Sequence, residues 1–186
     1  MDKEILDSFE AKLQEALLRM CTSEGALEGV LLNTPDFEEK WNGGLGEAYV
    51  AEAVKEFNEY PEVALAWAGY LGMAVAVSWD KGMVRFLQDK YEDFHGQRGF
   101  DDMDEHITRD ILKHPLSSEE ARGIASLMYG CAATALSLIR HEGFESGSID
   151  AYFVFIRCCK AIFLTGAAVQ LKAMGYKMTK VNGLPS

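Results

Sequence analysis

The segment PEVALAWAGYLGMAVAVSWD, residues 61–80, constrains the fold most, because it carries no charge between Glu62 and Asp80. Its apolar residues cover every face of a helical wheel, so a helix here needs partners on all sides. Residues 123–139 form a second uncharged, Ala-rich segment. A third apolar segment, residues 149–171, is interrupted by Arg157 and Lys160. The chain must therefore shield three long apolar helices from water.

Two environments satisfy such helices, a lipid bilayer and the centre of a helical bundle. The uncharged run Val63–Trp79 gives a helix of about 25 Å, which is shorter than the ~30 Å hydrocarbon core. Arg157 and Lys160 near the middle of the third segment are costly in lipid. The loops are acidic or neutral, whereas basic loops orient membrane proteins. We therefore expect no membrane span and three buried helices packed through Ala and Gly.

Amphipathic segments surround these three. Ile5, Phe9, Leu13 and Leu17 recur at helical spacing in the first twenty residues. A helix capped by Asp80 is expected to bury Val84, Leu87, Tyr91 and Phe94 on one face, and another is expected over residues 101–112. Strand-like alternation never exceeds four or five residues. The prediction is an all-α fold: a single-domain multi-helix bundle of about six or seven helices with Ala/Gly-rich buried central helices. It covers residues 1–186, with residues 176–186 as an irregular C-terminal tail.

Charge narrows the classes of partner. The net charge is −11 over 186 residues, which excludes a nucleic-acid binder because phosphate contacts need clustered Lys and Arg. Residues 1–120 carry a net −15 and residues 121–186 a net +4. The opening MDKEILDSFE has no signal-peptide pattern, so we expect a cytoplasmic protein.

The cysteines offer neither a zinc site nor a C-x-x-C redox motif. Cys21 and Cys131 are isolated, and Cys158 and Cys159 are adjacent. We expect all four to be reduced and buried as small apolar side chains.

Several residues are candidates for binding. Arg157 and Lys160 lie three apart on an otherwise apolar helix, and a buried charge must be paired. If they face inward, they pair with Asp80 or an acidic helix, bind an anion, or lie in a subunit interface. If they face outward, they form a narrow solvent-exposed stripe. Trp67 and Tyr70 are further candidates, because aromatic side chains on one helix can line a binding pocket. In the other interpretation they are part of the hydrophobic core.

One constellation resembles a metal site. In DDMDEHITRD, residues 101–110, the spacing of four places Asp102, His106 and Asp110 on one helix face. Carboxylates and imidazole bind divalent transition metals. However, an acidic first turn also suits a helix N-terminus, and no second ligand cluster is present in the sequence. We expect no bound metal and no cofactor.

These patterns support two hypotheses of different classes. The first is a non-catalytic binding or interaction module whose acidic surface engages a basic protein partner or a second copy. The alternative is an enzyme whose site lies between helices and uses Asp102, His106 and His141 as metal ligands or acid/base groups. Convergence of these residues in a concave pocket would favour the enzyme.

Overall fold

The computed structural model describes residues 1–177, and over these residues the fold is all-helical with no strand, which confirms the predicted all-α class. The α-helices are α1 (Lys3–Ser23), α2 (Pro35–Lys40), α3 (Gly46–Glu56), α4 (Pro61–Asp80), α5 (Met83–Gln88), α6 (Tyr91–His95), α7 (Met103–His106), α8 (Glu119–His141) and α9 (Ile149–Ala173). Three short helical turns join some of them: η1 (Trp41–Leu45), η2 (Phe100–Asp102) and η3 (Ile107–Ile111).

Helices α4 and α9 pack against each other more extensively than any other pair of elements. Pro61 opens α4 at its first turn, and nearly every residue from Ala64 to Ser78 is buried. The two backbones approach closely at Gly72 and Gly166. A Cβ atom added at Gly72 would overlap the backbone of Phe163, and one at Gly166 would overlap the backbone of Gly69. Glycine is required at both positions because nothing larger fits between the helices.

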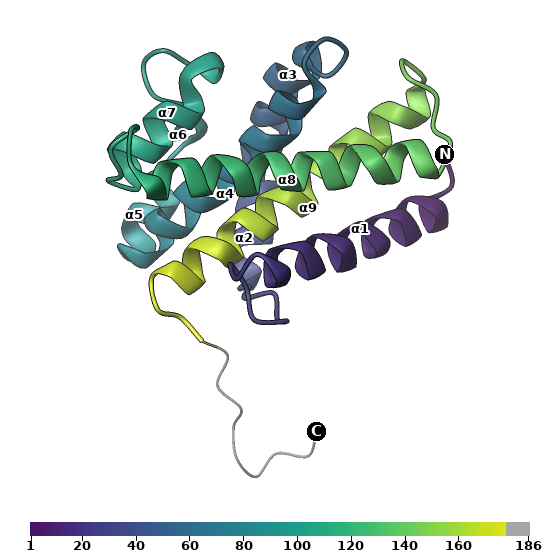
Figure 1. Cartoon of the computed structure of the whole chain (residues 1–186). Coiled ribbons are helices and arrows are strands. Elements are labelled where there is room, and N and C mark those ends of the chain that lie inside the picture. Colours follow the sequence, from purple (N-terminus) through teal and green to yellow (C-terminus); the bar gives the residue numbers. More distant parts are fainter. Residues whose placement is uncertain (178–186) are drawn as a thin grey trace.

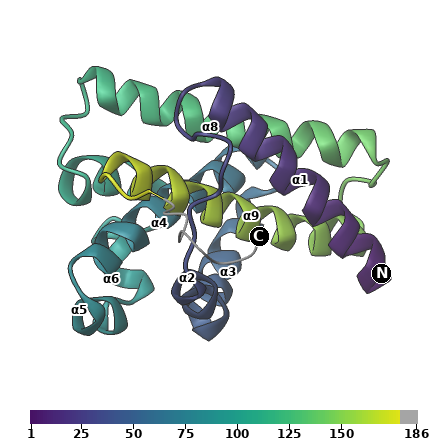
Figure 2. The same ribbon diagram turned by 90° about the horizontal axis from the view of Figure 1, so that it is seen from below.

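Helices α1 and α8 cover this pair (Figures 1 and 2). The apolar face of α1 is buried as its spacing predicts, with Leu13 and Leu17 fully inaccessible. Ser118 caps the start of α8, where its hydroxyl accepts a hydrogen bond from the Ala121 N–H at 3.1 Å. Of these helices, α8 exposes a broad face, and the uncharged residues on that face are Gly123, Ser126, Tyr129, Ala133 and Ser137.

The segment between α4 and α8 differs from the expected pair of long helices. The helix expected after Asp80 is divided at Asp89–Lys90 into α5 and α6. Val84 and Leu87, predicted to be buried, are 73% and 70% exposed. The helix expected over residues 101–112 is divided into η2, α7 and η3. These short elements gather at one end of the molecule, away from the chain N-terminus (Figure 1).

The prediction of no membrane span is wrong, and the cytoplasmic location inferred with it is contradicted. Helices α4, α8 and α9 are each long and apolar enough to cross a membrane, by length and composition. The sequence argument measured the uncharged runs, whereas the helices extend past them to 20, 23 and 25 residues. At about 1.5 Å per residue these are roughly 30 to 38 Å long. In the fold, 78% of the most apolar stretch of α4 is buried, against 28% of that of α8.

The expected C-terminal tail begins at Tyr176, and Tyr176 and Lys177 follow α9 without helical structure. Residues 178–186 of that predicted tail lie outside the described residues.

Candidate functional site

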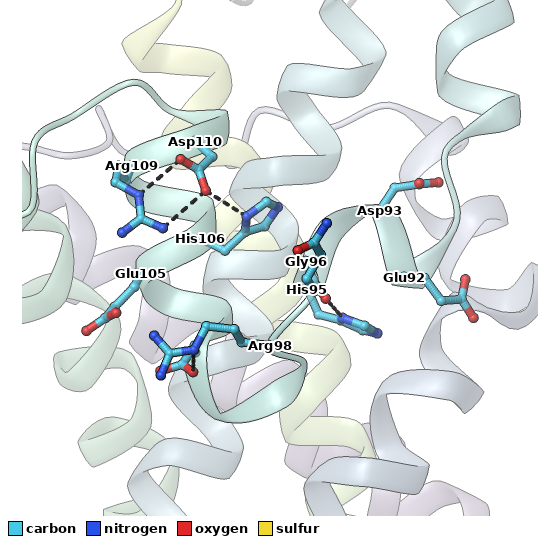
Figure 3. A pocket seen from close by; sticks show the side chains of 11 residues that line it. Glu92, Asp93, His95, Gly96, Arg98, Glu105, His106, Arg109 and Asp110 are labelled. Carbon is cyan, nitrogen blue, oxygen red and sulfur yellow. Dashed lines mark hydrogen bonds and ion pairs between the residues drawn. The ribbon is translucent and has the colours of Figure 1, made fainter.

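A hollow in the described surface lies between α6 and the segment formed by η2, α7 and η3. We call it the α6–α7 cleft. Its volume is about 650 Å³, and its lining residues are Glu92, Asp93, His95, Gly96, Gln97, Arg98, Asp102, Glu105, His106, Arg109 and Asp110. Figure 3 shows these side chains around the opening. All of them come from one stretch of fewer than twenty residues, so the cleft is a local structure of the chain.

The shape of the cleft depends on how α6 begins and ends and on the helical turn η3. The backbone N–H of Lys90 donates to the Asp93 carboxylate at 2.8 Å, which fixes the start of α6. Gly96 ends α6 with φ +77°, a left-handed conformation that glycine adopts without strain. The cleft's far wall ends in the π-helical turn η3. Such turns are rare in helices and frequently occur at functional sites.

His106 and Asp110 form a hydrogen-bonded pair in the cleft. The His106 Nδ1 donates to Asp110 Oδ2 at 2.9 Å, and the Arg109 Nε donates to Asp110 Oδ1 at 3.0 Å. The Arg109 hydrogen bond, followed by that of His106, lowers the pKa of Asp110. Gly96 lies against the His106 ring, and a Cβ at residue 96 would be 2.7 Å from the ring carbon Cγ. The imidazole is therefore held between a backbone turn and a carboxylate (Figure 3).

Carboxylates outnumber arginines in the cleft. Arg98 pairs with Asp102 at 2.8 Å. Glu92, Asp93 and Glu105 take part in no ion pair within residues 1–177. The cleft has five carboxylates against two arginines, together with two histidines. Its net charge is thus negative even with both arginines counted, which favours a cationic group as its occupant.

The core of the bundle anchors the cleft. The Trp67 indole N–H of α4 donates to the carbonyl of Phe100, two residues before Asp102, at 2.9 Å. The Tyr91 hydroxyl at the start of α6 donates to the Glu52 carboxylate of α3 at 3.2 Å. These two bonds attach both walls of the cleft to longer helices. Tyr70 packs edge-on against Trp67 at 5.5 Å between ring centroids. Trp67 and Tyr70, predicted as binding residues, are buried behind the cleft rather than in it.

The predicted cations lie elsewhere. Arg157 donates to Asp7 at 2.9 Å and also pairs with Glu10, both on α1. Lys160 pairs with Glu38 of α2 at 2.6 Å. Both cations are half-buried and paired with acidic helices of the same chain, which is one of the arrangements that the sequence left open.

Asp80, the remaining predicted binding residue, accepts a hydrogen bond from the Tyr176 hydroxyl at 2.6 Å. It makes no ion pair with Arg157 or Lys160 within the described residues. The structure therefore brings Trp67 and Tyr70 together, but separates them from Asp80 and from the two cations.

The residues of the alternative metal site share one cleft but do not form a metal-binding group. Asp102, His106 and Asp110 all line the α6–α7 cleft. Within residues 1–177, no group of three His, Cys, Asp or Glu side chains is arranged to hold a metal ion. His141, assigned with Asp102 and His106 in the enzyme hypothesis, lies instead in a shallow hollow beside Ala16 of α1. The three residues of that hypothesis do not form one site.

Sequence reasoning missed several residues of the cleft. His95 and Arg98 belong to HGQRG, residues 95–99, where the helical spacing of apolar residues breaks off. Its two left-handed glycines, at φ +77° and +76°, turn the chain so that His95, Arg98 and His106 line the same cleft. The available signal was the density of charged and His residues on both sides of that break.

Comparison with protein-family models, curated proteins and solved structures finds no match.

Proposed function

We propose that the chain is a non-catalytic binding protein whose α6–α7 cleft takes a cationic side chain of a basic protein partner. The observation that carries this proposal is the surplus of carboxylates in the α6–α7 cleft, where Glu92, Asp93 and Glu105 make no ion pair within residues 1–177. The net charge of −11 adds long-range attraction for a basic partner. The elements that line the cleft lie outside the three helices long enough to cross a membrane.

The finer architecture belongs to the same proposal. We infer a bundle with an Ala/Gly-rich centre, formed by α4 and α9, on which the cleft segment is mounted. The close approach at Gly72 and Gly166 supports this centre. The hydrogen bond from Trp67 to Phe100 supports the mounting of the cleft on α4. A rigid centre preorganises the cleft, which reduces the entropy lost when a partner binds.

Binding of a labelled nonapeptide of alternating Lys and Ser, followed by fluorescence anisotropy, tests the proposal. We expect saturable binding that weakens as salt is added. The double substitution Glu92→Gln with Glu105→Gln is expected to lower the affinity about tenfold, since each lost charge contact contributes roughly 0.5–1 kcal/mol.

The matched control is Glu59→Gln with Glu145→Gln, which removes the same charge from exposed positions outside the cleft. It should change the affinity by less than about twofold because screening weakens distant charges. Equal losses in the two double variants would show attraction to the overall charge and would exclude the cleft. An absence of binding by the unmodified protein would overturn the proposal itself.

A further inference from the structure

Helix α8 has one face that the described part of the chain leaves uncovered. It runs along the outer edge of the bundle (Figure 2), and only 28% of its most apolar stretch is buried. The exposed positions between Arg122 and Arg140 carry no charge, although 25% of the chain's residues are charged. Surface helices ordinarily carry charged residues on the face that points away from the core. This face is therefore suited to contact with another helix.

A hollow borders the uncharged face. It lies between α8 and α1, its volume is about 530 Å³, and among the described residues no carboxylate lines it. Small side chains form most of its lining, which consists of Ala16, Ala133, Thr134, Ser137, Leu138 and His141. Such side chains let a second helix approach α8 closely, as the glycines do between α4 and α9.

The two ends of α8 carry opposite charges. Glu119 and Glu120 begin the helix, and Arg140 and His141 end it. All four side chains are exposed. None of them takes part in an ion pair within residues 1–177. A surface that is acidic at one end and basic at the other is complementary to its own copy when that copy runs in the opposite direction.

We propose that a second copy of the chain covers this face, with the two α8 helices antiparallel about a twofold axis close to Tyr129. In this register Ser126 of each copy lies level with Ala133 of the other, and Glu119 lies level with Arg140. Each contact occurs twice, as in any twofold interface. A parallel pair would instead place Glu119 beside Glu119 and Arg140 beside Arg140, and like charges repel.

The size of the face determines the expected strength of the dimer. The strip from Arg122 to Arg140 is about 27 Å long and about 10 Å wide, which is less than the roughly 800 Å² that each partner buries in a standard interface. The hollow beside α1 extends it. Tyr129 is 40% exposed, so each copy adds an aromatic side chain near the centre of the interface. We therefore expect a dimer that dissociates at micromolar concentrations.

This surface is separate from the proposed binding site, because no described residue of α8 lines the α6–α7 cleft. Dimerisation and peptide binding can therefore be measured independently of each other.

Sedimentation velocity of the purified full chain, over about 1–300 µM, tests the proposal. We expect a shift from monomer toward dimer as the concentration rises. Ala133→Arg places a long cation in the middle of the face and should weaken dimerisation at least about tenfold. Ala51→Arg is the matched control, because Ala51 is exposed on α3, and it should change the dissociation constant by less than about twofold. A chain that stays monomeric throughout, or equal effects of the two variants, would overturn the proposal.

Two double variants test the polarity of the face. Glu119→Lys with Glu120→Lys gives α8 two cationic ends, and Arg140→Glu with His141→Glu gives it two acidic ends. Neither variant should dimerise alone, whereas an equimolar mixture of the two should form heterodimers. Circular dichroism verifies that each variant is folded. Dimerisation of either variant alone, or a mixture that stays monomeric, would contradict the antiparallel arrangement.

Hydrogen exchange of the unmodified chain requires no substitution. Amides of residues 119–141 should exchange more slowly at the highest concentration than at the lowest, while those of α3 should not change. Protection confined to another element would place the interface elsewhere and overturn the proposal.

A lipid surface is the competing occupant of this face, because α8 is long and apolar enough to cross a membrane. Flotation of the chain with phosphatidylcholine vesicles distinguishes the two. We expect no flotation that depends on this face. Flotation that Ala133→Arg abolishes would assign the face to lipid and overturn the proposal.

Discussion

At the scale of single residues, Asp104 combines a charge with partial burial. It lies in the first turn of α7, and its negative charge adds to burial in raising the pKa of Tyr70 and Tyr129. Burial raises the pKa of its carboxyl, and the backbone N–H of Glu105 only partly offsets this effect. The protonated form is therefore favoured by folding, and the stability that this contributes is present at low pH and is lost as the pH rises through the folded pKa.

The prediction is that Asp104→Asn stabilises the protein at pH 7, because the variant has no carboxylate to desolvate. The advantage should shrink as the pH falls, and it should disappear below the pKa of an unfolded aspartate. Thermal melts from pH 3 to pH 8 measure it. A variant whose advantage grows toward low pH would contradict the assigned cause. Glu59→Gln, which removes an exposed carboxylate, serves as the comparison and should change stability by less than about 0.5 kcal/mol.

Two glycines in the cleft provide a sharper comparison. Gly96 and Gly99 share a left-handed backbone, but only at Gly96 would a Cβ atom meet a neighbour, the His106 ring. We expect Gly99→Ala to cost about 1–3 kcal/mol from backbone strain alone, because its φ of +76° with ψ of −154° is a conformation that essentially only glycine adopts. Gly96→Ala should cost more and should weaken binding of the cationic peptide, since His106 must move. Urea denaturation and anisotropy measure the two effects, and equal behaviour of the two variants would show that the contact is unimportant.

At the scale of elements, the close contact between α4 and α9 depends on two glycines, Gly72 and Gly166, which have no side chain. Gly72→Ala would place a methyl group against the backbone of Phe163, which cannot move as a flexible side chain can. We expect a loss of about 3 kcal/mol or more. Gly123→Ala on α8 is the matched control, because nothing lies within 4 Å of its added Cβ. It should stabilise the protein by roughly 0.5–1 kcal/mol through helix propensity. Destabilisation of similar size in both would contradict the close contact.

The elements also show which parts of the fold could be predicted from the sequence. The positions of α1, α4, α8 and α9 were predicted because long periodic or uncharged runs leave one solution, a helix. The division between α5 and α6 was not, because Val84 and Leu87 have helical spacing but are exposed. Asp89 breaks that helix through tertiary contacts: its carboxylate accepts from the Ser78 hydroxyl at 2.7 Å, and its carbonyl accepts from Lys40 at 2.6 Å. Contacts between residues that are ten to fifty positions apart leave no pattern in the local sequence from which they could be predicted.

The candidate site was predicted less completely than the fold. Asp102, His106 and Asp110 were identified by their spacing of four, and all three line the cleft. The opposite wall, formed by α6, was missed because it depends on the left-handed turn at Gly96, which brings the chain back so that Gly96 lies against the His106 ring of α7. The pairing of Arg157 was left open for a similar reason. Its partners Asp7 and Glu10 are about 150 residues away in sequence.

At the scale of the whole molecule, ion pairs connect the acidic first part of the chain to the basic last part. Arg157 joins α9 to α1, and Lys160 joins α9 to α2. The Arg157 side chain is 27% exposed and that of Glu10 is 13% exposed, so the first pair is only partly screened by water. Such pairs hold the covering helices on the central one.

We predict that Arg157→Met destabilises the protein by about 1–3 kcal/mol, since it leaves the half-buried Glu10 without its cation. Methionine keeps an apolar side chain of similar length, so the decrease in the free energy of unfolding measures the contribution of the charge. Arg19→Met is the control, because the Arg19–Glu15 pair is 73% exposed on both sides and should contribute less than about 0.5 kcal/mol. Guanidinium denaturation measures both. Equal effects would show that the Arg157 pair is no stronger than a surface pair.

The hydrogen bond from Trp67 to Phe100 has a consequence for spectroscopy. An indole whose N–H is bonded to the turn at the cleft wall senses any movement of that turn through its emission. Trp79 is bonded instead to Asp36 at 2.9 Å, and Trp41 packs on Phe163 in the core. With Trp41 and Trp79 replaced by phenylalanine, the remaining indole becomes an intrinsic probe of the cleft. It would report an occupant without any attached dye.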